Sequence, residues 1–350
     1  MPPPLLLLTM GDAAGIGPEI ICRAFAQGAA QGCVVVGDAA VLARAARLVQ
    51  PLSVPVGLIE RVADAPDLPP GCIPVLQPSG LPEGLSSLPW GRIDARCGAA
   101  AARCIDDAVR RVRGGEAAGL VTAPVHKEAL AAAGVPFPGH TEMLQALAAD
   151  GGDLPPVRMM LASDELRVVL VTIHVALRRA VDLISVERVL QTLRITHRWL
   201  RGWQGGAPRI AVAGLNPHAG EGGLFGDEER LFIAPAVAAA RTEGIDASGP
   251  FPPDTVFMRA RRRSGYAEPF DVVVAMTHAH GLIPVKYLGV EQGVNVTLGL
   301  PLVRTSPDHG TAFDIAGRGT ADASSLCAAI ATARRMLAQR AAAPAPSSAS

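Results

Sequence analysis

Short apolar segments alternate along the chain with longer segments in which apolar and polar residues repeat at helical spacing. Six short segments consist almost entirely of Val, Leu, Ile and Ala, which is typical of strands buried on both faces of a sheet. These predicted strands span residues 5–9, 33–37, 118–123, 166–173, 209–215 and 271–276. Helices are predicted over 92–113, 126–133, 185–204 and 227–243. This alternation indicates an α/β fold with a mostly parallel sheet covered by helices.

Two segments interrupt the alternation. Residues 51–90 are rich in Pro, Gly and Ser, which predicts an irregular connection. Residues 341–350 are Ala, Pro and Ser of low complexity, which predicts a disordered tail. The strand and helix pattern continues through the middle of the chain, so residues 1–340 are expected to form a single unit. We expect that unit to have two lobes with interleaved chain segments and a cleft between them.

The composition favours a globular protein that acts on a small molecule. A chain of 350 residues that is 49% hydrophobic can bury a large core. Its 32 basic and 32 acidic residues balance, so no net field would attract nucleic acid or an anionic membrane. The six cysteines form no CxxC pair and are predicted to be reduced packing thiols. The N-terminal MPPPLLLL lacks the basic region of a signal peptide, which predicts a cytoplasmic protein.

Three histidines follow three different predicted strands. His174, His218 and His278 each lie at or just beyond the carboxyl end of one of them. Because the carboxyl ends of parallel strands meet at one edge of a sheet, the three side chains are expected to converge. Neutral imidazoles from separate elements suit a divalent ion such as Zn²⁺ with coordination positions open to a substrate. The alternative is that each histidine is an ordinary polar residue after its strand.

Three further histidines have less specific contexts. His280 is a candidate fourth ligand, or a hydrogen-bond partner of the first three, because it follows His278 closely. His126 and His197 are interpreted as surface or helix residues.

Several residues are suited to binding an anion. The motif PGHTEM (138–143) places His140 and Thr141 at a predicted helix start, where free N–H groups and the helix dipole attract phosphate or carboxylate. Ordinary capping by Thr141 is the alternative. A later glycine-punctuated stretch adds three polar candidates, of which the two cations could also be simple surface residues: Lys286, Asn295 and Arg304.

The segment MGDAAGIGPEI (10–20) predicts a glycine-rich turn between a strand and a helix. Its glycines, Gly11, Gly15 and Gly17, do not have the GxGxxG spacing of a Rossmann dinucleotide loop, and Pro18 stands in the first helical turn. We interpret the segment as a tight turn at the active site. The chain also lacks GxxxxGK[ST], which argues against a P-loop nucleotide hydrolase.

Six long motifs occur in order along the chain: GDAAGIGPEI, TAPVHKEAL, PGHTEML, NPHAGEGGLFGDEE, GPFPPDTVF and GVNVTLGLPLVRTSPDHGTAFDIAGRGTADASS. Together they resemble the 4-hydroxythreonine-4-phosphate dehydrogenase family of vitamin B6 biosynthesis, over about residues 5–340. The run HGTAFDIAGRG (309–319) also resembles the cofactor-binding stretch of isocitrate and isopropylmalate dehydrogenases. That wider resemblance implies their two-lobed α/β fold, with mostly parallel sheets, helices on both faces and a cleft between the lobes.

The family resemblance implies a metal-dependent oxidoreductase. Its members oxidise the 3-hydroxyl of 4-phosphohydroxy-L-threonine with NAD or NADP. The product, 2-amino-3-oxo-4-phosphooxybutanoate, then loses CO₂ to give 3-amino-2-oxopropyl phosphate. The resemblance also implies one divalent ion per site (Zn, Mg or Co), held by His174, His218 and His278. A homodimer with the active site at its interface, sharing ligands between subunits, is the implied assembly.

Other residues take roles from the same resemblance. Five match substrate-binding positions: His140, Thr141, Lys286, Asn295 and Arg304. Four lie in the stretch expected to face the nicotinamide cofactor: Asp308, His309, Gly310 and Thr311. The proton acceptor stays open between Lys286, Asp254 and a water molecule on the metal.

Two departures from the family pattern leave alternatives open. The chain reads His278-Ala279-His280 where HDQ is usual, and Ala13 stands where proline is usual. A sister dehydrogenase acting on D-threonate 4-phosphate, D-erythronate 4-phosphate or a dihydrodiol acid is therefore an alternative. A phosphate acyltransferase shares the wider fold, but its chemistry needs neither metal nor nicotinamide. A metal-stabilised binding protein without catalytic activity is the third alternative.

Overall fold

The chain forms two compact units. The computed structural model describes residues 5–49, 54–137, 139–149, 151–262, 265, 269–289 and 293–342. The first unit combines Met1–Pro155 with Leu300–Leu337, and the second combines Pro156–Gly299 with Ala338–Ser350. Each unit therefore contains chain segments that are distant in sequence.

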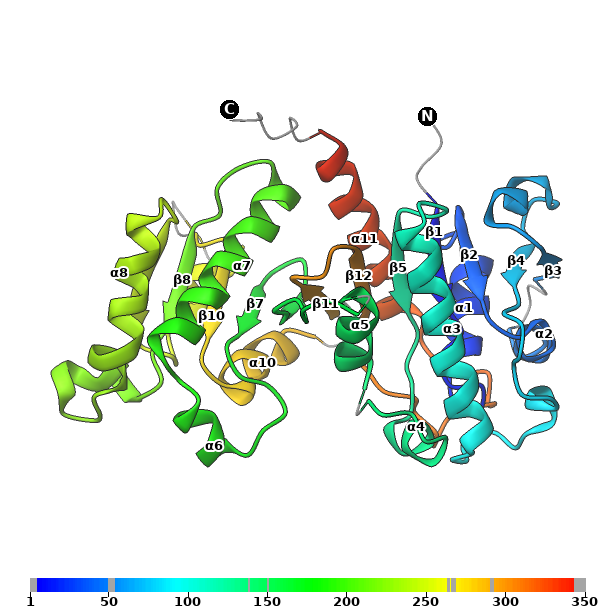
Figure 1. Cartoon of the computed structure of the whole chain (residues 1–350), viewed down its shortest axis with the longest axis horizontal. Helices are drawn as coiled ribbons and strands as arrows, with labels where there is room; N and C mark the ends of the chain where they lie inside the picture. The colour runs from blue at the N-terminus through cyan, green and yellow to red at the C-terminus, as the bar shows by residue number, and fades with distance from the viewer. Residues whose placement is uncertain are drawn as a thin grey trace. The chain divides into compact units, whose positions relative to one another are not determined.

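The described strands of the first unit pair in parallel (Figure 1). Their spatial order is β3 (Val56–Ile59), β4 (Ile73–Leu76), β2 (Cys33–Val36), β1 (Leu6–Thr9), β5 (Gly119–Thr122) and β12 (Val303–Pro307). Strand β1 is buried along its whole length, and its Leu7 lies opposite Val34 of β2 and Leu120 of β5. A central parallel strand is apolar throughout because both of its faces are covered.

Two helices of the first unit, α2 and α3, begin after an aspartate that satisfies a free backbone N–H group. Asp94 accepts a hydrogen bond from the N–H of Arg96 at the start of α3 (Ala95–Arg113), which packs against β1 and β5. Asp38 caps α2 (Ala39–Ala46) in the same way. Pro18 occupies the first turn of α1 (Gly17–Ala26), where no N–H donor is needed. The remaining helical segments are α4 (Lys127–Ala132), α5 (His140–Ala149), η1 (Val62–Asp67), η2 (Leu85–Ser87) and α11 (Ser324–Ala342).

The described strands of the second unit form a mixed arrangement. Their spatial order is β11 (Val294–Leu298), β6 (Arg158–Ala162), β7 (Arg167–Leu170), β10 (Val272–Ala275), β8 (Ile210–Ala213) and β9 (Ala247–Phe251). Strand β6 is antiparallel to both of its neighbours, and the other pairs are parallel. The carboxyl ends of β7, β10 and β8 therefore lie at the same edge.

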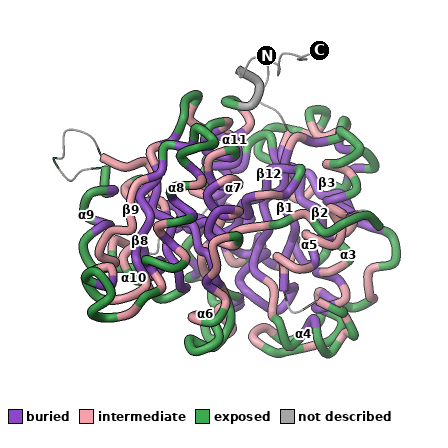
Figure 2. Tube along the Cα trace, turned by 60° about the vertical axis from the view of Figure 1, so that its left-hand side comes forward, coloured by how far each residue is buried: buried purple, intermediate pink, exposed green. Residues whose placement is uncertain are grey.

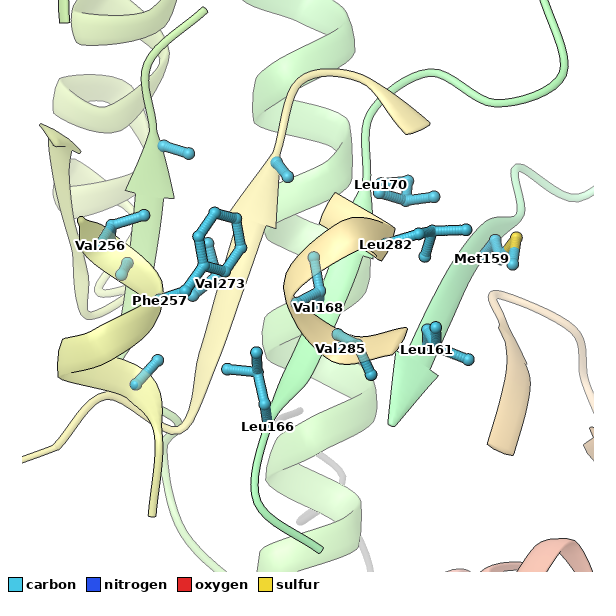
Figure 3. Close-up of a cluster of buried hydrophobic side chains, with 14 residues drawn as sticks. Met159, Leu161, Leu166, Val168, Leu170, Val256, Phe257, Val273, Leu282 and Val285 are labelled. Atoms are coloured by element: carbon cyan, nitrogen blue, oxygen red, sulfur yellow. The ribbon is translucent and has the colours of Figure 1, made fainter. Parts of the chain in front are cut away.

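Two short helices complete the core of the second unit. Helices α9 (Val256–Ala260) and α10 (His278–Tyr287) place Phe257, Leu282 and Val285 against Val168 and Val273 (Figure 3). Each such side chain contributes roughly 1.5–3 kcal/mol when fully buried. The other helical segments are α6 (Leu177–Asp182), α7 (Val186–Gln204), α8 (Ala234–Thr242), η3 (Pro217–Gly223) and the π-helical η4 (Glu229–Ile233).

The predicted fold class and all six predicted strands are confirmed, as β1, β2, β5, β7, β8 and β10. Buried residues follow these strands, and exposed residues lie mostly in loops and on outer helix faces (Figure 2). The four predicted helices correspond to α3, α4, α7 and the pair η4 and α8.

One structural prediction was wrong. The segment 51–90 is not merely an irregular connection, since it contains β3 and β4, which extend the parallel sheet.

Of the predicted tail, residues 343–350 lie outside the described residues. All six cysteines are free thiols. None of the helices in the described part of the chain is long and apolar enough to cross a membrane.

Candidate functional site

The three predicted ligands all lie in the second unit, beyond neighbouring parallel strands. His174 follows β7, His218 lies in η3 after β8, and His278 opens α10 after β10. All three side chains are exposed. Strand β10 pairs with both β7 and β8, so the three loops leave from one edge of the sheet.

Two of these imidazoles face one another. The ring centroids of His174 and His278 are 5.7 Å apart, and both side chains line a cavity of about 280 Å³. Thr172 joins the two loops, because its N–H and its hydroxyl both donate to the carbonyl of Met276, at 3.2 and 2.8 Å. The rest of the lining is mainly apolar: Ile173, Val175, Leu177, Ala180, Thr277 and Ala279.

Backbone strain is concentrated in the predicted site segments. Five described residues other than glycine have positive φ: His174, His218, Ala219, Glu221 and Ala312. The first two are predicted ligands, with φ of 49° and 53°, and Ala312 follows the predicted cofactor stretch. Such conformations are unfavourable for residues with a Cβ and persist where surrounding structure enforces them, commonly at functional sites.

A buried glutamate holds the strained loop of His218. The Glu229 carboxylate accepts hydrogen bonds from the backbone N–H groups of Leu215 and Asn216, at 2.6 and 2.8 Å, and from the Asn216 amide at 3.0 Å. A Cβ at Gly220 would lie 2.8 Å from the same carboxylate. Burial raises the pKa of Glu229, but these hydrogen bonds outweigh burial and leave the pKa below its ordinary value. No sequence pattern marks Glu229 as a site residue apart from its place at the end of the motif NPHAGEGGLFGDEE.

The described part of the chain does not gather three metal-binding side chains at one point. Among the described residues, no group of three or more His, Cys, Asp or Glu side chains is close enough to hold a metal ion. The ring of His218 lies 6.0 Å from the ring of Phe225. The metal-ligand set of His174, His218 and His278 therefore stays a prediction. Two of its members, His174 and His278, lie close together in this unit.

Other candidates in the second unit are spread over different elements. His280 is half-buried on α10, outside the lining of the histidine cavity, and burial lowers its pKa. Lys286 lies exposed in the last turn of α10, about 12 Å along the helix axis from His278. Asn295 is half-buried in β11 opposite Leu161, and Asp254 is exposed just before α9.

The first unit brings two predicted anion-binding residues together. Arg304 is 2% exposed in β12 and donates from Nη2 to the hydroxyl of Thr122, at 2.6 Å. Burial lowers its pKa to about 10, so it remains cationic at neutral pH. His140 is the first residue of α5, followed by the half-buried Thr141, and its buried Nε2 has no hydrogen-bond partner. Burial and then the nearby charge of Arg304 hold the pKa of His140 well below 6.5, so this imidazole is neutral.

The predicted cofactor stretch packs against the glycine-rich turn. The N–H of Ile16 donates to the carbonyl of Thr311 at 3.0 Å, and a Cβ at Gly15 would lie 3.0 Å from the Thr311 side chain. The N–H of Asp308 donates to the hydroxyl of Ser325 at 3.2 Å. His309 Nδ1 lies 3.0 Å from the carbonyl oxygen of Gly310, and Gly310 is an exposed residue.

Two polar residues near this turn have notable environments. His126 was interpreted as a surface or helix residue, but it is half-buried before α4 and stacks on Phe313, with ring centroids 4.7 Å apart. His197 lies in α7, as that interpretation allowed. Asp12 is 1% exposed and accepts from the N–H of Ala14 at 2.9 Å, and burial raises its pKa.

Comparison with known proteins identifies the family. A sequence model of the family described as "Pyridoxal phosphate biosynthetic protein PdxA" matches residues 29–333. The chain belongs to this family. A 4-hydroxythreonine-4-phosphate dehydrogenase of Beijerinckia indica is 52% identical over 335 residues, which cover 95% of this chain and 94% of the relative. The resemblance drawn from the six motifs is thus confirmed.

Two further similar proteins bear on substrate and fold. A D-threonate 4-phosphate dehydrogenase of Salmonella typhimurium is 45% identical, with 94% of this chain and 98% of the relative covered. A crystal structure of a 4-hydroxythreonine-4-phosphate dehydrogenase from Klebsiella pneumoniae superposes with a TM-score of 0.85 at 43% identity. The alignment covers 96% of this chain and 98% of that one.

Proposed function

We propose that this chain oxidises 4-phosphohydroxy-L-threonine with NAD or NADP in pyridoxal phosphate biosynthesis. The product would be 2-amino-3-oxo-4-phosphooxybutanoate, which decarboxylates to 3-amino-2-oxopropyl phosphate. The observation that carries the proposal is the family match, which spans nearly the whole chain and includes every motif with a candidate site residue.

The proposed metal ligands are His174, His218 and His278, for one divalent ion such as Zn, Mg or Co. The facing rings of His174 and His278, the strained backbone at His174 and His218, and the open cavity fit such an ion. A bound ion would polarise the substrate hydroxyl and favour the negative charge that develops on its oxygen.

The phosphate and carboxylate of the substrate would be held by the anion-binding residues. Arg304 supplies a buried cation, and His140 supplies a neutral ring whose Nε2 can donate a hydrogen bond. A cation and a neutral N–H donor can both bind the oxygens of one phosphate. Thr141, Lys286 and Asn295 are the other proposed contacts. Asp308, His309, Gly310 and Thr311 would face the cofactor, and Lys286 or Asp254 would take the proton of the hydroxyl.

We further propose that the site is completed in a homodimer. Large apolar side chains near the histidines in sequence are exposed, including Leu177 at 67%, Ile283 at 65% and Tyr287 at 90%. Ile283 and Tyr287 are one helical turn apart on α10, so they share a face. Exposed apolar side chains of this size are typical of surfaces that a partner covers.

The activity is tested by following NADH or NADPH formation with purified protein and 4-phosphohydroxy-L-threonine, with and without a chelator. D-Threonate and D-erythronate 4-phosphates are assayed in parallel. Metal-dependent turnover of the amino acid supports the proposal. Turnover of a threonate or erythronate phosphate alone would instead make the chain a sister dehydrogenase, which the 45% identical Salmonella typhimurium relative keeps as the second candidate.

Ligand sharing is tested by mixing two inactive variants, His218→Ala and His278→Ala. If the two histidines of one site come from different subunits, each mixed dimer has one intact site, and activity returns to about a quarter of the wild-type value. If both come from one subunit, every site in the mixture lacks a ligand and no activity returns.

Sedimentation of the wild type and of Tyr287→Glu tests the apolar surface, with Leu58→Glu in the first unit as the control for an exposed apolar residue.

A further inference from the structure

Arg44 of α2 connects two loops of the first unit through backbone carbonyls. Its Nη1 donates to Ser86 and Leu88, at 2.9 and 2.6 Å, and its Nη2 donates to Ala13, at 3.1 Å. The side chain is half-buried, and burial lowers its pKa although the group stays cationic at neutral pH. A guanidinium alone offers donors in a fixed planar fork, so one side chain holds two loops at a set distance.

The same guanidinium stacks on Trp90. The Arg44 Cζ lies 3.7 Å from the centroid of the indole ring, within the range of a cation–π contact. The indole also lies against Gly317, where a Cβ would clash with the ring. Trp90 thus occupies the space between Arg44 and the segment that follows the predicted cofactor stretch.

Three segments interlock around this pair: the glycine-rich turn 11–16, the loop 85–91 and the stretch 311–319. The turn donates from Ile16 to Thr311, and the loop donates from Gly91 to the carbonyl of Ala14 at 2.8 Å. Gly91 also lies so close to the carbonyl of Phe313 that any Cβ there would clash. Displacing one segment therefore displaces the other two.

We infer that Arg44 and Trp90 are positioning residues that set the place of the stretch 308–313 for the nicotinamide cofactor. This inference rests on the proposed function, in which that stretch faces the cofactor. Neither residue belongs to the proposed substrate or metal sites. Loss of the pair is therefore expected to weaken cofactor binding and to leave the affinity for the phosphorylated substrate and kcat at saturating cofactor nearly unchanged.

The experiment measures NADH binding directly, by energy transfer from tryptophan to bound NADH, in wild type, Arg44→Met and Arg44→Lys. Removing three hydrogen bonds from a charged donor is expected to raise the Kd for NADH roughly ten-fold or more. The lysine variant is not expected to restore affinity, because one ammonium cannot reach both loops and stack on the ring. Steady-state kinetics should show a raised KM for NAD with an unchanged KM for substrate.

The matched control is Arg167→Met in the second unit. Arg167 also stacks on a tryptophan, Trp203, at 4.6 Å, and it lies at the amino end of β7, whereas His174 follows the carboxyl end of that strand. Both variants must be folded and have comparable melting temperatures. If Arg167→Met and Arg44→Met then bind NADH with equal affinity, the positioning role is overturned, but the proposed cofactor site is not. A wild-type protein that binds neither NADH nor NADPH would overturn the cofactor assignment and the inference with it. If Arg44→Met does not fold, Trp90→Phe replaces it with the same expected direction, and NADH binding is then followed by the fluorescence of NADH itself, because this variant lacks one of the energy-donating tryptophans.

Discussion

In the first unit the polar side chains beside the predicted anion and cofactor segments are buried or held by neighbouring loops, whereas in the second unit the predicted metal ligands are exposed. Arg304 donates to Thr122 and Arg44 to three carbonyls, all within the unit. His174 and His278 stand at the rim of an open cavity, and His218 lies on a loop with five consecutive left-handed residues.

This difference indicates two kinds of preorganisation. The first unit arranges its predicted binding groups by contacts within its own chain, so substitutions there should lower affinity without abolishing activity. The second unit holds His174 and His218 in strained backbone conformations, and in the proposed function the partners of its histidines would be a metal ion, a substrate and a second subunit. Substitutions among the histidines should therefore remove activity almost completely.

The largest effect is expected for His278→Ala. Loss of one ligand should lower kcat/KM on the order of a thousand-fold, because charge on the substrate oxygen would no longer be stabilised. Metal content, measured on the same preparation, should fall as well. His197→Ala, in a half-buried helical position away from these loops, serves as the control. Full metal content and activity in His278→Ala would remove this residue from the ligand set.

A smaller effect is expected for Arg304→Met in the first unit. The variant loses a buried cation but keeps the approximate length of the side chain, so KM for the phosphorylated substrate should rise about a hundred-fold with a smaller change in kcat. Initial rates over a range of substrate concentrations give both constants. An unchanged KM would show that Arg304 stabilises the fold rather than the phosphate.

Glu229→Gln tests whether the loop of His218 is held by charge. Its carboxylate accepts from two backbone N–H groups, and weakening these bonds should cost about 2 kcal/mol of unfolding free energy at neutral pH. Because the folded pKa of Glu229 is below 4.5, the stability it provides is present above that value and is lost as the pH falls through the folded pKa. Thermal unfolding at pH 7 should therefore separate wild type from variant, and the difference in melting temperature should narrow as the pH falls through the folded pKa.

The smallest effect is expected for the protonation of His140. Its folded pKa lies well below 6.5, so the unfolded chain binds a proton that the folded chain does not. Stability is therefore highest above pH 6.5 and falls toward lower pH, by at most about 1.4 kcal/mol per pH unit. Urea unfolding over this range should show the loss in wild type and a flatter profile in His140→Gln. Parallel profiles would mean that His140 is solvated and not held neutral.

Local sequence was sufficient for the elements whose environment is uniform. The strands β1, β2 and β10 are buried at every position, so their apolar runs were unambiguous. Two of the strands that were missed, β3 and β12, lack such a run of buried apolar residues. Strand β3 lies at the sheet edge with an exposed Leu58, and β12 contains the buried Arg304. In both, the neighbouring strands rather than the residues themselves determine the extended conformation.

The sequence by itself determined the α/β class, the positions of the central strands and the three histidines that follow them, since these depend on local apolar runs and on motif residues. Only the tertiary structure decided that His174 and His278 face each other, that Glu229 holds the loop of His218, and that Arg44 and Trp90 join three loops. These contacts link residues far apart in the chain. Their geometry follows from strand order and close packing, which no local pattern encodes.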